Sequence, residues 1–205
     1  MTGVRSYGDP CGIARALDAV GERWALLVVR ELLLGPKRFT DLRAALGASP
    51  NVLSQRLGEL EAAGVVERRN ATGALYELTE WGRQLHPILL QLGRWGARSS
   101  QRPVGELGVD ALMLALESTF LPEQAGELHS TYELRVGDER FAVAISEGAI
   151  AIARGSPRKA DAVIETRSET LRALVFGGMK LAGAPVELAG DIRLAKAFFK
   201  LFARP

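Results

Sequence analysis

The sequence predicts an α+β protein of two domains, residues 1–100 and 104–205, and three observations lead to this prediction. Apolar side chains recur at helical spacing through most of the first hundred residues. In the second half, several strand-like runs stand together between helices, so strands and helices are segregated rather than alternating. The polar run Ser99-Ser100-Gln101-Arg102-Pro103 lies between the halves and is typical of a linker.

Composition narrows the classes of protein to which the chain can belong. Residues 1–100 hold 13 Lys and Arg against 10 Asp and Glu, a net charge of +3, whereas residues 101–205 hold 13 against 14, a net charge of −1. The positive first half favours an anionic partner. Cys11 is the single cysteine, so no disulfide forms within the chain. Because the sequence has no signal-peptide character and no apolar run of ~18 residues, we expect a cytoplasmic protein without a membrane partner.

An enzyme, a metal site and a cofactor are not expected. The two histidines, His86 and His129, lie far apart in the sequence, and neither has a neighbouring Cys, His, Asp or Glu at metal-ligand spacing. The sequence has no nucleophile elbow, no phosphate-binding loop and no dinucleotide fingerprint.

The first half begins with two expected helices. The first runs from Gly12 to Gly21 and carries Ile13 and Leu17 on its apolar side. The second runs from about Arg23 to Leu34 and is apolar nearly all round, which is typical of a buried central helix. Gly35-Pro36 ends it.

A short helix and a longer one follow. The short helix is expected over Thr40–Leu46, with Thr40 as its cap and Gly47 as its terminator. Ser49-Pro50 then starts a helix that extends to about Ala63, because serine caps a helix N-terminus and proline fits the first helical position. The apolar face of this helix consists of Leu53, Leu57 and Leu60.

After Gly64 the spacing of the apolar residues changes from that of a helix to that of a strand. Residues 65–69 and 74–78 are expected to form a hairpin, with its turn at residues 70–73. Thr79 is expected to cap a long helix over residues 80–98. The apolar stripe of that helix is wide for the end of a domain, so we expect a partner subunit or the second half of the chain to cover it.

Together these elements predict a winged helix-turn-helix. Two helices joined by the turn Gly47-Ala48-Ser49 form the helix-turn-helix, and the hairpin after them is the wing. A DNA major groove, about 12 Å wide, accepts one helix whose outward side is polar and not bulky. The residues expected to hydrogen-bond to bases are Asn51, Ser54 and Gln55.

Basic residues lie where DNA phosphates would be. Contacts to phosphates set the position of a protein on the duplex and supply much of its affinity. The residues expected to make them are Lys37, Arg38, Arg43, Arg56, Arg68 and Arg69. The same pattern also fits a helical bundle with a hairpin, in which these are ordinary surface charges.

Several spaced motifs carry a family resemblance. They are CGIARALD from Cys11, GERW from Gly21, REL from Arg30, RFTDL from Arg38, LSQRL from Leu53 and YELT from Tyr76. Over residues 11–98 the chain thereby resembles the HxlR family of bacterial winged-helix regulators, which implies a DNA-binding transcription regulator that dimerises through its first and last helices. The dimer residues that the resemblance implies are Ile13, Leu17, Trp81, Leu85, Ile88, Leu92 and Trp95. The chain has Cys11-Gly12 where the family usually has Cys-Pro, and its wing is short, but neither departure touches the helix over residues 49–63.

Cys11 has two open interpretations. Some family members resemble thiol sensors at this position, with oxidation linking the subunits, and Arg15 one turn further on would favour the thiolate. The other interpretation is a small, partly buried residue at the start of a helix.

The second half predicts a helix, an antiparallel meander and further short elements. The expected helices are 109–120, 168–176 with Ser168 as its cap, and 191–202. The expected strands are 131–136, 140–146, 149–153, 161–166 and 186–188.

Over residues 106–203 this half resembles the sterol carrier protein type two fold, a small α+β lipid-binding domain. The opening helix and the runs AIAI from Ala149, DAVIET from Asp161 and VELAGD from Val186 carry the resemblance. It implies an apolar cavity between sheet and helices, although the same aromatic residues also fit a filled core. The candidates for contact with an apolar ligand are Phe176, Met179, Phe198, Phe199 and Phe202.

The sequence therefore predicts a homodimeric regulator that binds double-stranded DNA and whose C-terminal domain senses an apolar small molecule or lipid. The alternative is a lipid-binding or carrier protein that uses its helical half only for dimerisation.

Overall fold

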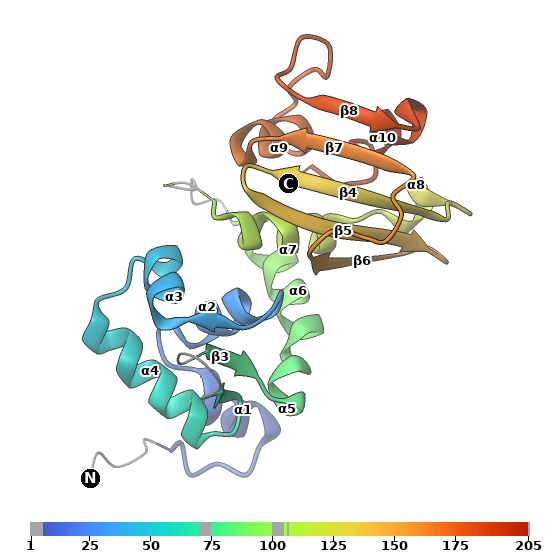
Figure 1. The fold of residues 1–205 in the computed structure, drawn as a ribbon. Helices are drawn as coiled ribbons and strands as arrows, with labels where there is room; N and C mark the ends of the chain where they lie inside the picture. The colour runs from blue at the N-terminus through green and yellow to red at the C-terminus, as the bar shows by residue number, and fades with distance from the viewer. Residues whose placement is uncertain (1–5, 70–74, 100–104, 106, 205) are drawn as a thin grey trace. The chain divides into compact units, whose positions relative to one another are not determined.

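A computed structural model describes residues 6–69, 75–99, 105 and 107–204 of the chain (Figure 1). The chain divides into two compact units, Met1–Leu89 and Leu90–Pro205. The predicted turn of the wing, residues 70–73, and most of the predicted linker lie outside the described residues.

The N-terminal unit has the predicted order of elements, with one strand more and with the last predicted helix divided in two. Its helices are α1 (Gly12–Val20), α2 (Ala25–Leu32), α3 (Phe39–Leu46), α4 (Pro50–Ala62), α5 (Glu80–Arg83) and the start of α6 (Leu85–Gly96). Its strands are β1 (Lys37–Arg38), β2 (Val66–Arg69) and β3 (Leu75–Leu78), in the order β1-β3-β2. The strand β1 was not predicted, because two charged residues carry no strand pattern. It forms through pairing with Leu75 and Tyr76 of β3.

The core of this unit is built from the predicted apolar faces. Val28 and Val29 of α2 are fully buried, and they lie in one cluster with leucines from α3 and α4. The prediction of a buried central helix is confirmed for this side of α2, whereas Leu27 on its other side is exposed.

The helix-turn-helix is held by caps at both ends of its turn. Gly47 ends α3 with φ 63°, a left-handed conformation that glycine adopts without steric cost, and its N–H donates to the carbonyl oxygen of Arg43 at 2.9 Å. Ser49 then caps α4, because its side-chain oxygen accepts from the N–H of Val52 at 3.4 Å, and Pro50 occupies the first helical position as predicted.

The cap predicted at Thr40 is wrong. The N-cap of α3 is Arg38, whose backbone N–H donates to the Asp41 carboxylate at 3.3 Å. The helix therefore begins earlier, directly after β1, because pairing of β1 with β3 fixes the backbone up to Arg38.

The long helix predicted over residues 80–98 is interrupted at Gln84. Proline at position 87 has no N–H to donate to the carbonyl four residues earlier, and its ring crowds that carbonyl, so a continuous helix is disfavoured there. Thr79 caps α5 as predicted and accepts from the N–H of Gly82 at 3.0 Å. Gly82 is required at its position, since a Cβ there would lie 2.1 Å from the carbonyl oxygen of Val65.

The C-terminal unit is a five-stranded mixed sheet with helices. The strands are β4 (Ser130–Val136), β5 (Glu139–Ser146), β6 (Ala149–Arg154), β7 (Ala162–Thr166) and β8 (Glu187–Gly190), in the order β6-β5-β4-β7-β8. The helices are α7 (Val109–Thr119), α8 (Pro122–Ala125), α9 (Ser168–Val175) and α10 (Ile192–Phe198). The antiparallel meander of β4, β5 and β6 is confirmed, and β7 pairs with β4 in parallel.

Helices α7, α9 and α10 lie on one side of this sheet (Figure 1). The strand residues that face them are fully or nearly fully buried, among them Tyr132, Phe141 and Ile164. The last helix ends at Phe198 rather than Phe202, because the following residues extend along the segment after α7, where Leu121 N–H donates to the Leu201 carbonyl at 2.8 Å. The cap predicted at Ser168 is also wrong, since Arg167 is the N-cap of α9 and its side chain makes no capping bond.

A charged network crosses the other side of the sheet. Glu133 of β4 accepts from Arg135 at 3.1 Å and from the Ser156 hydroxyl at 2.7 Å. Arg135 also donates to Glu165 of β7 at 3.2 Å. The hydrogen bonds from Arg135 and then Ser156 hold the pKa of the Glu133 carboxyl below its ordinary value of 4.5.

Glu133→Gln tests this network through its dependence on pH. A lowered pKa means that the ionised carboxylate stabilises the folded state above pH 4.5, and that this stabilisation is lost as the pH falls through the lowered pKa. We expect the variant to lower the free energy of unfolding by about 1 kcal/mol at neutral pH, and by progressively less in acid. Urea unfolding followed by circular dichroism at several pH values measures this. The exposed Glu127→Gln is the control and should match the wild type throughout.

Ser49→Ala tests the cap of α4. Loss of the side-chain acceptor should lower the free energy of unfolding by about 1 kcal/mol. Ser54→Ala, at an exposed position of the same helix, should stay within about 0.5 kcal/mol of the wild type. Equal losses in the two variants, measured by chemical denaturation, would contradict the assignment of Ser49 as the cap.

Candidate nucleic-acid interface

Helix α4 separates an anchored side from an outward one. Leu53, Leu57 and Leu60 are buried, as predicted. The predicted base-reading residues Asn51, Ser54 and Gln55 are all exposed on this helix. The Gln55 amide donates to the Glu59 carboxylate at 2.9 Å, so its side chain lies along the helix in this conformation. Gly58 has open space where a Cβ would lie, so the backbone of α4 is accessible there.

Arg56 is placed differently from its predicted role. Its residue exposure is only 7%, and its guanidinium forms an ion pair with Glu59 of the same helix. A second carboxylate, that of Glu22 in the turn between α1 and α2, lies 3.7 Å away. Arg56 therefore links α4 to the α1–α2 turn instead of pointing to solvent. The spacing of three residues between Arg56 and Glu59 is the sequence signal for this pairing.

The other predicted cations fall into two groups. Lys37 pairs at 2.6 Å with Glu31, a buried carboxylate of α2 that also binds Arg30 at 2.8 Å. Arg69 of β2 pairs with the buried Glu77 of β3. The pairing of these two carboxylates was not predicted, because Lys37 and Arg69 belong to other elements of the chain. The cations that are exposed and form no ion pair among the described residues are Arg38, Arg43 and Arg68.

Arg68 has an aromatic neighbour in place of a carboxylate. Its guanidinium lies 5.9 Å from the centre of the Tyr76 ring, across β2 and β3. Cation–π contact orients an arginine without offsetting its charge. The wing therefore carries one arginine paired with an anion and one stacked on a ring.

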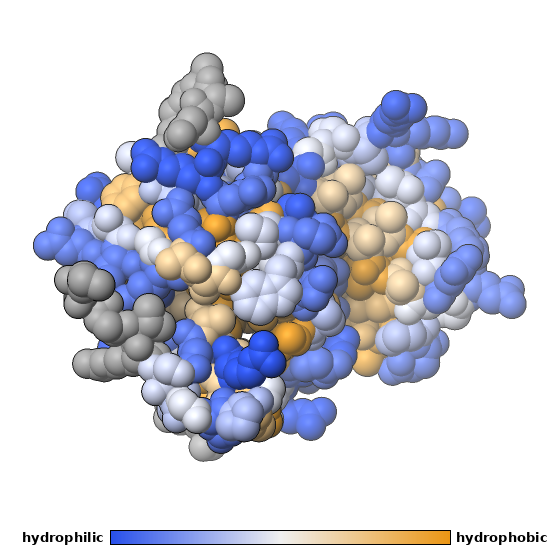
Figure 2. All heavy atoms as spheres, turned by 90° about the horizontal axis from the view of Figure 1, so that it is seen from below, coloured by the Kyte–Doolittle hydropathy of each residue, from blue (hydrophilic) through white to orange (hydrophobic). Residues whose placement is uncertain are grey.

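Large apolar side chains are exposed on α1, α5 and α6. Ile13 is 72% exposed, Trp81 52% and Ile88 58%, and Leu17, Leu92 and Trp95 are exposed as well. Leu85 differs, because it packs partly against the core. A cavity of about 240 Å³ lies in the N-terminal unit, lined by Val20, Val65, Trp81, Leu85 and their neighbours. In Figure 2, hydrophobic residues reach the surface among hydrophilic ones.

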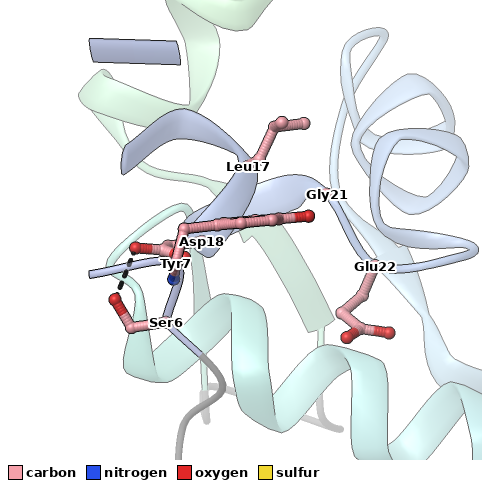
Figure 3. A pocket seen from close by; sticks show the side chains of 6 residues that line it. All are labelled: Ser6, Tyr7, Leu17, Asp18, Gly21 and Glu22. Atoms are coloured by element: carbon pink, nitrogen blue, oxygen red, sulfur yellow. Dashed lines mark hydrogen bonds between the residues drawn. The ribbon is translucent and has the colours of Figure 1, made fainter. Parts of the chain in front are cut away.

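The segment before α1 folds back onto that helix, a contact for which the sequence carries no local signal. The Ser6 hydroxyl and the Tyr7 N–H each donate to the Asp18 carboxylate at 2.9 Å. Together with Leu17, Gly21 and Glu22 these residues line a cavity of about 250 Å³ (Figure 3). Cys11, between this segment and α1, is exposed at the N-cap position.

The aromatic candidates of the C-terminal unit differ in exposure. Phe198 is fully buried and its ring packs on those of Tyr132, Phe199 and Phe202, at 5.0–5.8 Å between centroids. Phe176 and Phe199 are half-buried, and Met179 is 43% exposed. Burial raises the pKa of the Tyr132 hydroxyl, which lies at the centre of this cluster.

Two further kinds of site are absent from the described residues. There, no helix combines the length and apolar character that crossing a bilayer requires. Within the same residues, no three His, Cys, Asp or Glu side chains converge as a metal ion would require.

Comparison with known proteins places the N-terminal part of the chain. Residues 19–103 match the family model described as HxlR-like helix-turn-helix. The HTH-type transcriptional regulator YvaP of Bacillus subtilis, described as uncharacterized, is 42% identical over 86 residues, which are 40% of this chain and 80% of YvaP. The corresponding regulator Mb3122 of Mycobacterium bovis is 39% identical over 97 residues, 45% of this chain and 61% of Mb3122.

A solved structure matches over a similar share of the chain. Quinone-bound YodB from B. subtilis is 32% identical, with 42% of this chain and 97% of YodB covered and a TM-score of 0.39. Together with the exposed polar side of α4, the identity to YvaP favours a regulator over a carrier that uses its helical half only for dimerisation. The chain belongs to the HxlR family and is a DNA-binding, helix-turn-helix transcription regulator.

Proposed function

We propose that α4 enters the major groove of its operator and reads base edges with Asn51, Ser54 and Gln55. The observation that carries this proposal is the division of α4 into a leucine side buried in the core and a polar side open to solvent. Asparagine and glutamine suit adenine, whose major-groove edge has one donor and one acceptor. Because Gln55 donates to Glu59 in the free protein, reading a base with Gln55 requires this hydrogen bond to be exchanged.

The cations divide into those that bring charge to DNA and those that hold position. Arg38, Arg43 and Arg68 carry charges that no carboxylate of the described residues offsets, so their contacts with phosphates should release the most counterions. Glu31 orients Lys37, and Glu77 orients Arg69. Both cations remain candidates for phosphate contacts, but each should add less to the affinity for DNA because a carboxylate offsets part of its charge.

Arg56 takes the positioning role. It fixes α4 to the α1–α2 turn through Glu22, so its pairing sets the angle at which α4 leaves the core. This role replaces the phosphate contact that the sequence suggested for it.

The chain acts on DNA as a homodimer in this proposal. The interface is formed by Ile13, Leu17, Trp81, Leu85, Ile88, Leu92 and Trp95, most of which expose large apolar surfaces that a monomer would leave in water. Two copies would place two α4 helices on neighbouring half-sites. A cytoplasmic location, where the DNA lies, completes this part of the proposal.

The C-terminal unit is proposed to be a sterol-carrier-like domain that senses an apolar small molecule or lipid. The half-buried Phe176 and Phe199 and the exposed Met179 offer the contact surface, and Phe198 packs between Phe199 and Phe202 in the core. A ligand changes DNA binding only if its affinity differs between two states of the dimer. Exposed Cys11 offers a second input, oxidation that links the two subunits.

Two substitutions test the DNA contacts. Gln55→Ala should relax sequence preference, with a loss of about 1–3 kcal/mol of discrimination at one base pair. Arg43→Ala should weaken binding to all sequences alike and reduce the slope of log K against log salt concentration by about 0.9. Fluorescence anisotropy with a duplex from the gene's own upstream region, at several salt concentrations, measures both effects.

Arg158→Ala is the matched control, since it removes an exposed arginine from the C-terminal unit. It should leave both the affinity and the salt slope unchanged. Should Gln55→Ala and Arg43→Ala bind as the control does, the assignment of the DNA-contacting residues would be wrong.

Native mass spectrometry tests the dimer and the ligand together. We expect a mass of at least two chains, and an additional mass that organic extraction removes if an apolar ligand is retained. Ile88→Glu places a charge within the apolar helical surface and should shift the population towards assemblies of fewer chains. A wild-type protein of one chain at micromolar concentration would contradict the proposed interface.

A further inference from the structure

Strand β6 forms an open edge of the C-terminal sheet. It spans six residues, Ala149–Arg154, and pairs only with β5, on one side. Among the described residues, no backbone hydrogen bond joins its other side to any segment. A strand in this position presents N–H and C=O groups that a further strand can pair with.

The two edges of the sheet differ in protection. At the opposite edge, β8 has only four residues, begins with Glu187 and follows Pro185 closely. Short length, charge and proline are the ordinary means by which edge strands avoid pairing. Strand β6 has none of them within the run Ala149–Ala153. Its single charge, Arg154, is held by Asp110 and Glu139 and lies over the Phe141 ring.

The sequence of β6 reads the same in both directions. Residues 149–153 are Ala-Ile-Ala-Ile-Ala. The isoleucines lie on the side of the sheet that faces the core, opposite Ile145 and Val143 of β5, and the alanines lie on the other side. If two copies paired antiparallel about Ala151, Ile150 of each copy would stand opposite Ile152 of the other. Such self-complementarity is what an interface with two-fold symmetry requires.

We propose that β6 pairs with β6 of a second copy of this chain, antiparallel and centred on Ala151, and so joins two five-stranded sheets into one. In this register Arg154 faces Gly148 of the other copy and Glu147 faces Gly155, so no like charges meet. A second copy suits this edge, because its own run Ala149–Ala153 supplies the isoleucines that stand opposite Ile150 and Ile152. The interface is separate from the exposed apolar surfaces of α1, α5 and α6 and does not depend on DNA binding.

Disulfide trapping in the full chain tests the register. Residues directly opposite in an antiparallel pair have Cα atoms about 4.5–5.5 Å apart, within the range of a disulfide. In a Cys11→Ser background, Ala151→Cys should give a covalent dimer under mild oxidation about tenfold faster than the control, because pairing raises the effective concentration of the two thiols. The control is Ala144→Cys, which lies beside Ala151 on β5, on the same exposed face. Its thiols would be about 14 Å apart, at three strand spacings.

Hydrogen exchange supplies an independent measurement. The outward amides of β6 should be protected in the wild type and exposed in Ala151→Lys, in which two lysines meet at the two-fold axis. Ala144→Lys should retain the protection. Three results would each overturn the proposal. They are equal trapping rates at positions 151 and 144, unprotected β6 amides in the wild type, and an assembly whose mass rises with protein concentration without reaching a limit.

Discussion

The burial of one side of α4 is the constraint on which the DNA-binding unit depends. Leu53, Leu57 and Leu60 enter the same cluster as Val28 and Val29 of α2, so the helix cannot rotate about its axis without exposing them. Each buried leucine contributes about 1.5–3 kcal/mol through loss of contact with water. This anchoring gives the polar side of α4 a fixed direction, which is the condition for reading bases from a rigid element rather than a flexible one.

Electrostatics adds a second layer to the same surface. Glu31 and Glu77 are buried carboxylates, and a buried charge is tolerated only when it is paired. Their partners, Lys37 and Arg69, are therefore held in place, and the carboxylates offset part of the positive charge of these two side chains. Arg38, Arg43 and Arg68 keep theirs. The unit thus combines cations that are fixed in position with cations that are free to attract phosphates.

The C-terminal unit shows a similar division of its surfaces. One side of its sheet buries aromatic and branched side chains under the helices, and the other carries alanines and the Glu133–Arg135–Glu165 network. Its two edges are unlike as well, since β8 is short and charged whereas β6 is longer and apolar. Charge on the open face keeps that face in water, so pairing is favoured only along the unprotected edge.

The sequence by itself determined the elements whose signals are local. Caps at Gly47 and Ser49, the leucine period of α4, the meander of β4–β6 and the exposed Asn51, Ser54 and Gln55 all follow from residue types and spacing within one turn or one hairpin. Only the tertiary structure decided the pairing of β1 with β3, the burial of Arg56 beside Glu22, and the contact of Ser6 and Tyr7 with Asp18. These depend on partners that lie ten or more residues away in the sequence. The identity of a charged or polar residue does not show whether its side chain will have a partner within the fold or be exposed to solvent. The packing of the whole unit decides this.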